Sequence, residues 1–246
     1  MKQAMTAFAA ACALLLFAGC AFAMGGSEYD ARWLTGSGFV TSEARVVPDF
    51  TGIEVEGSGD VELSQGLVQS VTVECDDNIL PYVKADVVGD TIHLGMKTGT
   101  SVRRMTRMTF HITVPRVTSI VISGSGGVRA MTALRANALS LSIRGSGGIE
   151  AQLSVGSLVS SIGGSGDIDL SGSTDDIAVT IDGSGSVRAR ALQSTTADVR
   201  INGSGSVTVN ASDTIGIRIT GSGSVAYGGG GRATVASSGS GTARQY

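Results

Sequence analysis

The side chains best suited to catalysis gather between positions 167 and 190. The stretch contains five acids and two arginines, namely Asp167, Asp169, Asp175, Asp176, Asp182, Arg188 and Arg190. Acids that bind calcium, together with a basic residue that removes a proton, are what a pectate-lyase-type enzyme needs. Asp167 and Asp169 can share one strand face, whereas Asp175-Asp176 is typical of a turn. We interpret these acids as turn and solvent-facing strand residues, and keep a polysaccharide lyase or hydrolase as the less favoured alternative.

A calcium-binding repeat is the next candidate. Residues 163–170 read GGSGDIDL, close to the repeat G-G-x-G-x-D-x-U-x. The sixth position of that repeat must be aspartate, and here it is Ile168, while later units place Val187, Val207 and Val225 there. The sequence therefore predicts no bound calcium.

The only two histidines are His93 and His111, and each alternates with apolar residues in a strand-like run. They could face one another across paired strands, but neither has a carboxylate or thiolate partner nearby in sequence. We expect outward-facing strand histidines rather than metal ligands. Because no nucleophile, base and orienting acid can be assembled, we predict no enzyme, no catalytic residue, no metal and no cofactor.

The first 23 residues have the features of a secretory signal. Lys2 gives a basic start, and an apolar run of signal-peptide length follows at Ala7–Phe17. The signal can end in two ways, which both stay open. Phe17-Ala18-Gly19-Cys20 resembles a lipoprotein processing site, which would make Cys20 a lipidation site, whereas Ala21-Phe22-Ala23 is an A-x-A cleavage site. We expect an exported protein, located in the periplasm, on the outer membrane as a lipoprotein, or at the cell surface.

Cysteine and charge add limits on chemistry and partners. Beyond the signal only Cys75 remains, so no internal disulfide can form, and its apolar and acidic neighbours predict an inert thiol. The net charge of −3 becomes −4 when the signal, which carries Lys2 and no acid, is removed. This balance predicts no nucleic-acid partner, and membrane contact only through a lipid anchor. The one basic cluster, at 97–107, is interpreted as a solvated loop or hairpin tip, with anion or polysaccharide contact as the alternative.

The elements that position these residues follow from a repeat. Gly-Ser-Gly begins at Gly57 and then at Gly124, Gly145, Gly164, Gly183, Gly203, Gly221 and Gly239, with spacings of 18 to 21 residues among the last seven copies. Runs in which apolar and polar residues alternate flank each copy, which is the period of a strand with one buried face. One such unit cannot bury its own apolar face, so units must stack. We predict an all-β fold, a parallel β-helix (β-solenoid) of about 18–21 residues per coil with an irregular N-terminal β cap. A barrel or sandwich is the alternative.

Stacked coils would align the serines of the repeated tripeptide at one corner. The predicted row consists of Ser125, Ser146, Ser165, Ser184, Ser204, Ser222 and Ser240. Each hydroxyl can donate to one neighbour and accept from another. We favour an internal structural ladder over a repeated binding surface, because the flanking glycines leave little room for a ligand-facing array.

The same patterns divide the chain. Residues 1–23 are the signal peptide, or 1–19 if it is a lipoprotein signal; 24–49 form a linker or tether; 50–118 form an irregular N-terminal β region; and 119–246 form the Gly-Ser-Gly solenoid. The region 50–118 would cap the solenoid, because an open coil exposes unpaired strand groups.

Several segments match a known family in order and spacing. They are Phe50–Val55 (FTGIEV), Gly57–Leu63 (GSGDVEL), Val71–Glu74 (VTVE), Asp77–Leu80 (DNIL), Ile112–Pro115 (ITVP) and Ser123–Gly126 (SGSG). In these the chain resembles the head GIN domain family of auto-transporter adhesins, over roughly Val46 to Tyr227. The resemblance implies a β-solenoid-like fold and an exported bacterial envelope protein, and it brings no catalytic residues.

Two functions of different classes remain. The first is a non-catalytic, adhesin-like module that binds an envelope glycan or a surface protein, and the second is a structural scaffold or spacer without a ligand. Binding surfaces are rich in exposed aromatic residues. After Phe110 the chain has only Tyr227 and Tyr246, which argues against a sugar groove on the solenoid itself. If a contact region exists, the cap with Phe50, Tyr82 and Phe110 is the better candidate, although such aromatics are more often core.

Overall fold

A computed structural model describes residues 32–246, and these lie within one compact unit. The predicted signal peptide and Cys20 lie outside the described residues. Within them the regular structure is β-strand apart from η1 (Leu80–Tyr82), a three-residue 3-10 helix. No helix in this part of the chain is long and apolar enough to cross a membrane.

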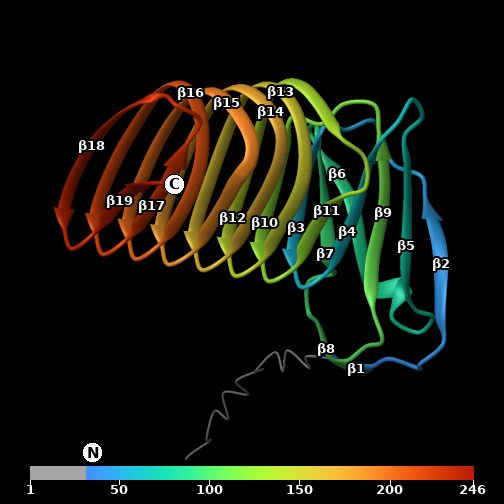
Figure 1. Cartoon of the computed structure of the whole chain (residues 1–246). Coiled ribbons are helices and arrows are strands. Elements are labelled where there is room, and N and C mark those ends of the chain that lie inside the picture. The colour runs from blue at the N-terminus through green and yellow to red at the C-terminus, as the bar shows by residue number, and fades with distance from the viewer. Residues whose placement is uncertain (1–31) are drawn as a thin grey trace, which may run out of the picture. The chain divides into compact units, whose positions relative to one another are not determined.

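Stacked coils make up most of the structure, and Figure 1 shows them side by side with the cap at one end. Each coil pairs in parallel with the next. The strands of the stack are β3 (Gly52–Gly57), β4 (Asp60–Gln65), β10 (Ser119–Gly124), β11 (Gly127–Ala130), β12 (Leu134–Gly145), β13 (Gly148–Gly164), β14 (Asp167–Gly183), β15 (Ser186–Gly203), β16 (Ser206–Gly221), β17 (Ser224–Gly228), β18 (Arg232–Gly239) and β19 (Thr242–Gln245). The predicted parallel β-solenoid is confirmed.

The cap joins the same sheet through mixed pairing. Its strands are β2 (Val40–Arg45), β5 (Ser70–Asp76), β6 (Val83–Val88), β7 (Thr91–Met96) and β9 (Met108–Val114). β7 and β9 add in parallel to the first coil, whereas β2, β5 and β6 pair antiparallel. A separate two-stranded arm is formed by β1 (Arg32–Thr35) and β8 (Thr100–Arg104). β7 and β9, which pair with β3 and β4, cover the first coil, as a cap must.

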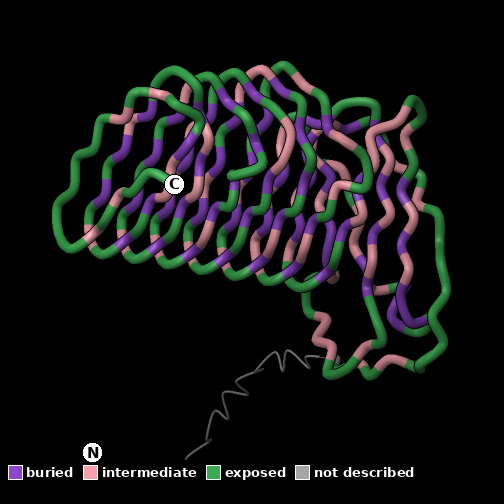
Figure 2. The backbone as a smooth tube through the Cα atoms, viewed as in Figure 1, coloured by how far each residue is buried: buried purple, intermediate pink, exposed green. Residues whose placement is uncertain are grey.

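Aliphatic ladders fill the inside of the coils, and Figure 2 shows buried positions alternating with exposed ones along the strands. One ladder places Ile53, Ile120, Leu141, Ser160, Val179, Val199, Ile217 and Val235 in register. Ile217 is 3% exposed but Val235, in the last coil, is 46% exposed. The ladder therefore opens to solvent at the C-terminal end.

Both glycines of each Gly-Ser-Gly corner are needed for its structure. Gly183 has a φ of 141°, a backbone conformation that glycine adopts at little cost. A Cβ on Gly185 would lie 2.6 Å from the carbonyl oxygen of Gly166 and 2.7 Å from Cγ2 of Ile162. The corner thus needs one glycine for its backbone conformation and the other for its close contact with the preceding coil.

Two features differ from the sequence-based interpretation. The corner at Gly57 pairs with the corner at Gly124, so part of the irregular region 50–118 forms the first coil of the stack. The pair Asp175-Asp176, expected as a turn, lies inside β14, and the segment 190–198 lies inside β15. Neighbouring coils continue to pair there, for example Asp176 with Thr196, and irregular register between paired strands replaces a separate loop.

Candidate functional site

An outward-facing row of ionisable side chains crosses six neighbouring strands, β9, β4, β11, β13, β14 and β15. It consists of His111, Glu62, Arg129, Glu150, Asp169 and Arg188, one from each strand and all in register. We call it the ionisable row. Each member precedes or follows a buried residue of an aliphatic ladder, so strand alternation forces it outward. At about 4.8 Å between strands the row is about 24 Å long.

Arginines hold the acids in the middle of this row. Nη2 of Arg129 lies 2.9 Å from Oε2 of Glu150. Arg188 contacts both Asp169, at 3.2 Å from Nε, and Asp167, at 3.1 Å from Nη1. The bond to Asp169 raises the pKa of Arg188 above its already high value, which keeps it charged. The carboxylates of Glu150 and Asp169 are therefore neighbours in the row. Each forms an ion pair with the arginine on its other side, Arg129 for Glu150 and Arg188 for Asp169.

A shallow depression lies beside the ionisable row. A second row, in register across the same strands, reads Asp60, Gly127, Gly148 and Asp167. Because the two glycines have no side chains, they leave a floor between the two aspartates, and the depression measures about 490 Å³. Asp60 accepts a hydrogen bond from the backbone N–H of Gly127 at 3.1 Å, which fixes one end of that floor.

His111 ends the row between two carboxylates. Its Nδ1 lies 3.0 Å from Oε2 of Glu62 and its Nε2 lies 3.0 Å from Oε2 of Glu74. Arg107 also contacts Glu74, at 3.1 Å. The hydrogen bond from His111 lowers the pKa of Glu74, burial opposes it, and Arg107 lowers it further. His111 thus joins two carboxylates that come from two different strands, β4 and β5.

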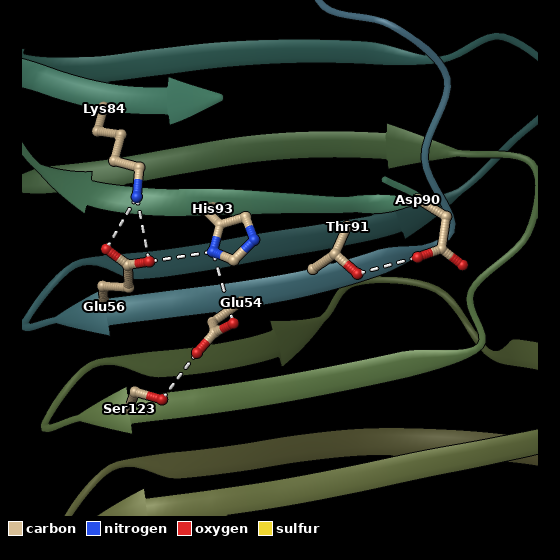
Figure 3. A network of polar contacts seen from close by, with 7 residues as sticks. All are labelled: Glu54, Glu56, Lys84, Asp90, Thr91, His93 and Ser123. Atoms are coloured by element: carbon tan, nitrogen blue, oxygen red, sulfur yellow. Dashed lines mark hydrogen bonds and ion pairs between the residues drawn. The ribbon is translucent and has the colours of Figure 1, made fainter. Parts of the chain in front are cut away.

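A second histidine cluster lies across the Gly57 corner, on the strand wall that contains β3 and β7 (Figure 3). Nδ1 of His93 is 3.0 Å from Glu56 and 3.5 Å from Glu54. Lys84 binds both oxygens of Glu56 at 3.1 Å. Burial acts to raise the pKa of Glu56, but the bonds from Lys84 and His93 outweigh it, so the pKa lies below its ordinary value. In this cluster Glu56 is held by both Lys84 and His93, and His93 also contacts Glu54.

Neither cluster has the arrangement of a hydrolytic site. The Ser123 hydroxyl donates to Glu54 at 3.0 Å, so it is hydrogen-bonded to an acid and not to the imidazole that would activate a nucleophile. Among residues 32–246, no group of three or more His, Cys, Asp or Glu side chains is placed to hold a metal ion. The clusters can order strands and bind polar groups at their rims.

The histidines lie differently from one sequence-based expectation. They do not face one another: His93 pairs with Glu54 and Asp86, while His111 pairs with Glu62 and Thr72. Each has carboxylate partners after all, on strands 37 to 49 residues away in sequence. Only the register of the cap strands could have revealed them.

The structure divides the acids that sequence inspection grouped together. Asp167 and Asp169 join the depression and the ionisable row. Asp176 accepts instead from the Thr196 hydroxyl, and Asp182 accepts from Asn202 at 2.7 Å. The guanidinium of Arg190 lies 4.3 Å from the centre of the Tyr246 ring. Glu62, Arg129 and Glu150, which the sequence did not single out, complete the site.

The corner serines form an exposed row on the outside of the coils. It consists of Ser125, Ser146, Ser165, Ser184, Ser204, Ser222 and Ser240. Backbone groups connect successive corners: the N–H of Ser184, for example, donates to the carbonyl of Gly164 at 2.9 Å. These serines are all exposed, and a ladder of bonds between their hydroxyls stays a prediction.

The aromatic residues of the cap divide between core and surface. Phe50 is 3% exposed and Phe110 is fully buried, so both are core residues. Tyr82 is partly buried in η1. Cys75 is buried on β5, and its burial raises the pKa of the thiol to about 11. Phe50, Phe110 and Cys75 therefore belong to the core of the cap, whereas Tyr82 is only partly buried.

Fold and surface together define a β-solenoid protein with a strand cap and a polar outer row. The chain belongs to the family described as "Putative auto-transporter adhesin, head GIN domain", whose model matches residues 49–231. No curated protein matches the chain.

Solved structures share the fold. A putative adhesin from Bacteroides fragilis is 24% identical, with a TM-score of 0.82, over 87% of this chain and 100% of that one. A "putative lipid binding protein" from Parabacteroides distasonis is 22% identical, with a TM-score of 0.75 and the same coverage. A putative adhesin from Parabacteroides merdae is 21% identical, with a TM-score of 0.69, over 87% and 99% of the two chains. At these identities the likeness concerns the fold.

Proposed function

We propose that this protein is a non-catalytic binding module of the bacterial cell envelope, and that the ionisable row with its depression is the contact surface. The observation that carries the proposal is the uninterrupted register of six ionisable side chains beside a floor of two glycines. A rigid stack holds these groups in place, which lowers the ordering cost of binding. Related solved structures bear the names "putative adhesin" and "Putative lipid binding protein", which agree with binding as the role.

The chemistry of the row suits a polar polymer of the envelope, such as a glycan. Carboxylates such as Glu150 accept hydrogen bonds from hydroxyl or amine groups, and guanidinium groups such as Arg129 donate to oxygens. Their regular spacing along about 24 Å matches an extended chain of similar units better than one compact ligand. A polar surface without aromatic side chains predicts modest affinity per unit, so binding gains from several units at once.

Catalysis is not part of the proposal. A hydrolase or lyase needs a carboxyl or imidazole free to take or give a proton. Here Asp167 and Asp169 are both bound by Arg188, and Glu150 is bound by Arg129.

Export is proposed on the sequence of residues 1–23, and the adhesin-like family agrees with an exported or surface protein. Two forms follow from the two processing sites. Lipidation at Cys20 would tether the module to a membrane, whereas cleavage after Ala23 would release it into the periplasm or medium.

The test uses the chain that begins at Met24, which keeps every described residue. It is applied to an array of envelope glycans and surface polymers, and turnover of the same polymers is assayed alongside. We expect binding without turnover, and at least a tenfold loss in the double variant Glu150→Gln with Arg188→Gln. The matched control is Arg200→Gln with Arg218→Gln, two exposed arginines before the corner, on another wall of the coils.

Each other outcome contradicts part of the proposal. Equal losses in both double variants would remove the row as the contact surface. Turnover would make the acids catalytic. No binding by a folded protein would favour the scaffold, a reading supported by the rigid stack of coils.

A further inference from the structure

The arm of β1 and β8 carries an unusual surface. Trp33 is 59% exposed, and Phe39, the residue directly before β2, is 75% exposed. Arg103 and Arg104 on β8 are both exposed, and the Arg103 guanidinium lies 5.4 Å from the centre of the Trp33 ring. Trp33 is also the only tryptophan in the chain. Exposed aromatic residues beside arginines are typical of surfaces that meet lipid headgroups.

The arm lies at one defined end of the cap, and Figure 1 shows β1 and β8 together there. Asp76, the last residue of β5, accepts from the N–H of Gly38 at 2.8 Å and from the N–H of Thr106 at 2.7 Å. These bonds fix the residue just before Phe39 and a residue just after β8. The aromatic and basic groups are therefore presented by a rigid end and not by a loose loop.

Charge at this end is mainly positive. Arg103 and Arg104 project from β8 and Lys97 is exposed before it, while Arg107 is paired with Glu74. Among residues 32–246, the exposed acid beside this end is Asp77, which accepts a hydrogen bond from Ser37. An anionic surface is complementary to such an end, and each arginine close to an anionic membrane contributes about 1 kcal/mol.

We propose that this end of the cap lies against an anionic phospholipid membrane, with Trp33 and Phe39 in the headgroup region and Arg103 and Arg104 on lipid phosphates. The inference rests on the proposed envelope location but not on the ligand of the ionisable row. If Cys20 is lipidated, eleven residues separate it from Arg32, and these span at most about 40 Å. Such a tether holds β1 near the bilayer.

The cap offers an internal control. Leu67 and Val68 are 97% and 77% exposed. They lie just before the first residue of β5, whereas Asp76, at the other end of β5, accepts the hydrogen bond from Gly38 that follows β1. They are as apolar as the arm but lie at the opposite end of that strand. A membrane that contacts the arm leaves this pair in water.

The experiment uses the chain from Met24 and vesicles of phosphatidylcholine with or without 30% phosphatidylglycerol. The emission of Trp33 should shift to shorter wavelength with the anionic vesicles only, and high salt should reverse it. Arg103→Gln with Arg104→Gln should weaken binding about 25-fold, about fivefold for each arginine. Phe39→Ser and Trp33→Ser should weaken binding as well. Because Trp33→Ser has no tryptophan emission, its binding is measured by co-sedimentation with the vesicles.

Leu67→Ser with Val68→Ser should bind like the parent protein. An unchanged Trp33 emission with anionic vesicles at low salt would overturn the proposal, as would equal losses in the Leu67 and Val68 variant. A shift produced by soluble glycans instead of vesicles would assign the arm to a polymer. Glycan binding on the array tests the ionisable row separately, so the two proposals can fail independently. Circular dichroism of each variant shows that it is folded.

Discussion

Ser160 lies in register with Leu141 inside the coils, fully buried, and its hydroxyl has no hydrogen-bond partner. On its other side it pairs with Val179, so a polar group interrupts an aliphatic ladder. A buried hydroxyl without a partner loses its hydration and gains nothing in return.

Removing this hydroxyl should stabilise the protein. Ser160→Ala deletes one oxygen and leaves the packing of Leu141 and Val179 almost unchanged, so we expect a gain of about 1 kcal/mol in the free energy of unfolding. Urea unfolding measures it. The control is Ser161→Ala, because Ser161 is half-buried and donates to Ser142 at 3.0 Å. A loss of stability in Ser160→Ala would show that the hydroxyl is satisfied after all.

The close contact at the corner predicts a glycine requirement. In Gly185→Ala the new Cβ would lie 2.6 Å from the Gly166 oxygen, and overpacking of this kind costs about 1 to 3 kcal/mol. Gly163→Ala is the matched control, since its Cβ would meet nothing closer than 3.9 Å. Thermal unfolding should show a large drop for Gly185→Ala, with a larger one for Gly185→Val, and almost none for Gly163→Ala. Equal effects would contradict the argument.

The repeat made the solenoid predictable because two local signals agreed. Alternating apolar residues defined strands, and the recurring tripeptide defined where each coil turns. The pairing of Gly57 with Gly124 was not predictable in the same way. The segment between them folds into the cap, and only the assembled structure shows that the first coil precedes it.

The full set of residues in the candidate site could not be predicted from the sequence alone. Asp167, Asp169 and Arg188 are close in the chain and were recognised as chemistry-bearing residues. Their partners in the ionisable row come from neighbouring coils and the cap, and His111 lies 49 residues from Glu62. Coil register decides which side chains become neighbours, and a single sequence fixes that register only where repeats are regular.

Burial of Cys75 predicts an unreactive thiol. With a pKa of about 11 the thiol is almost entirely protonated at pH 8, and only the thiolate reacts quickly with a disulfide reagent. In the chain from Met24, where Cys75 is the only cysteine, we expect no labelling by a chromogenic disulfide at pH 8 over the time in which the unfolded protein reacts fully. Fast labelling of the folded protein would show that β5 opens readily.

Asp76 predicts a pH-dependent loss of stability. It is fully buried and accepts from the N–H groups of Gly38 and Thr106 and from the Thr106 hydroxyl. Burial acts to raise its pKa, but these bonds outweigh it and hold the pKa below its ordinary value. Asp76→Asn should lower the free energy of unfolding by about 3 kcal/mol at pH 7. The two carboxylate oxygens accept three bonds, whereas the amide has a single oxygen and an NH₂ group that cannot accept.

The sign of the pH effect follows from that lowered pKa. A carboxyl whose pKa is lower in the folded state stabilises the fold above its unfolded pKa of about 3.9 and loses this contribution as the pH falls below it. Glu56 and Glu74 also have lowered pKa values, but they are present in both proteins and cancel in the difference. The stability difference between the parent and Asp76→Asn, measured by urea unfolding, should therefore be constant from pH 7 to 5 and shrink towards pH 3. A difference that stays constant down to pH 3 would mean that the charge of Asp76 does not hold the arm to the cap.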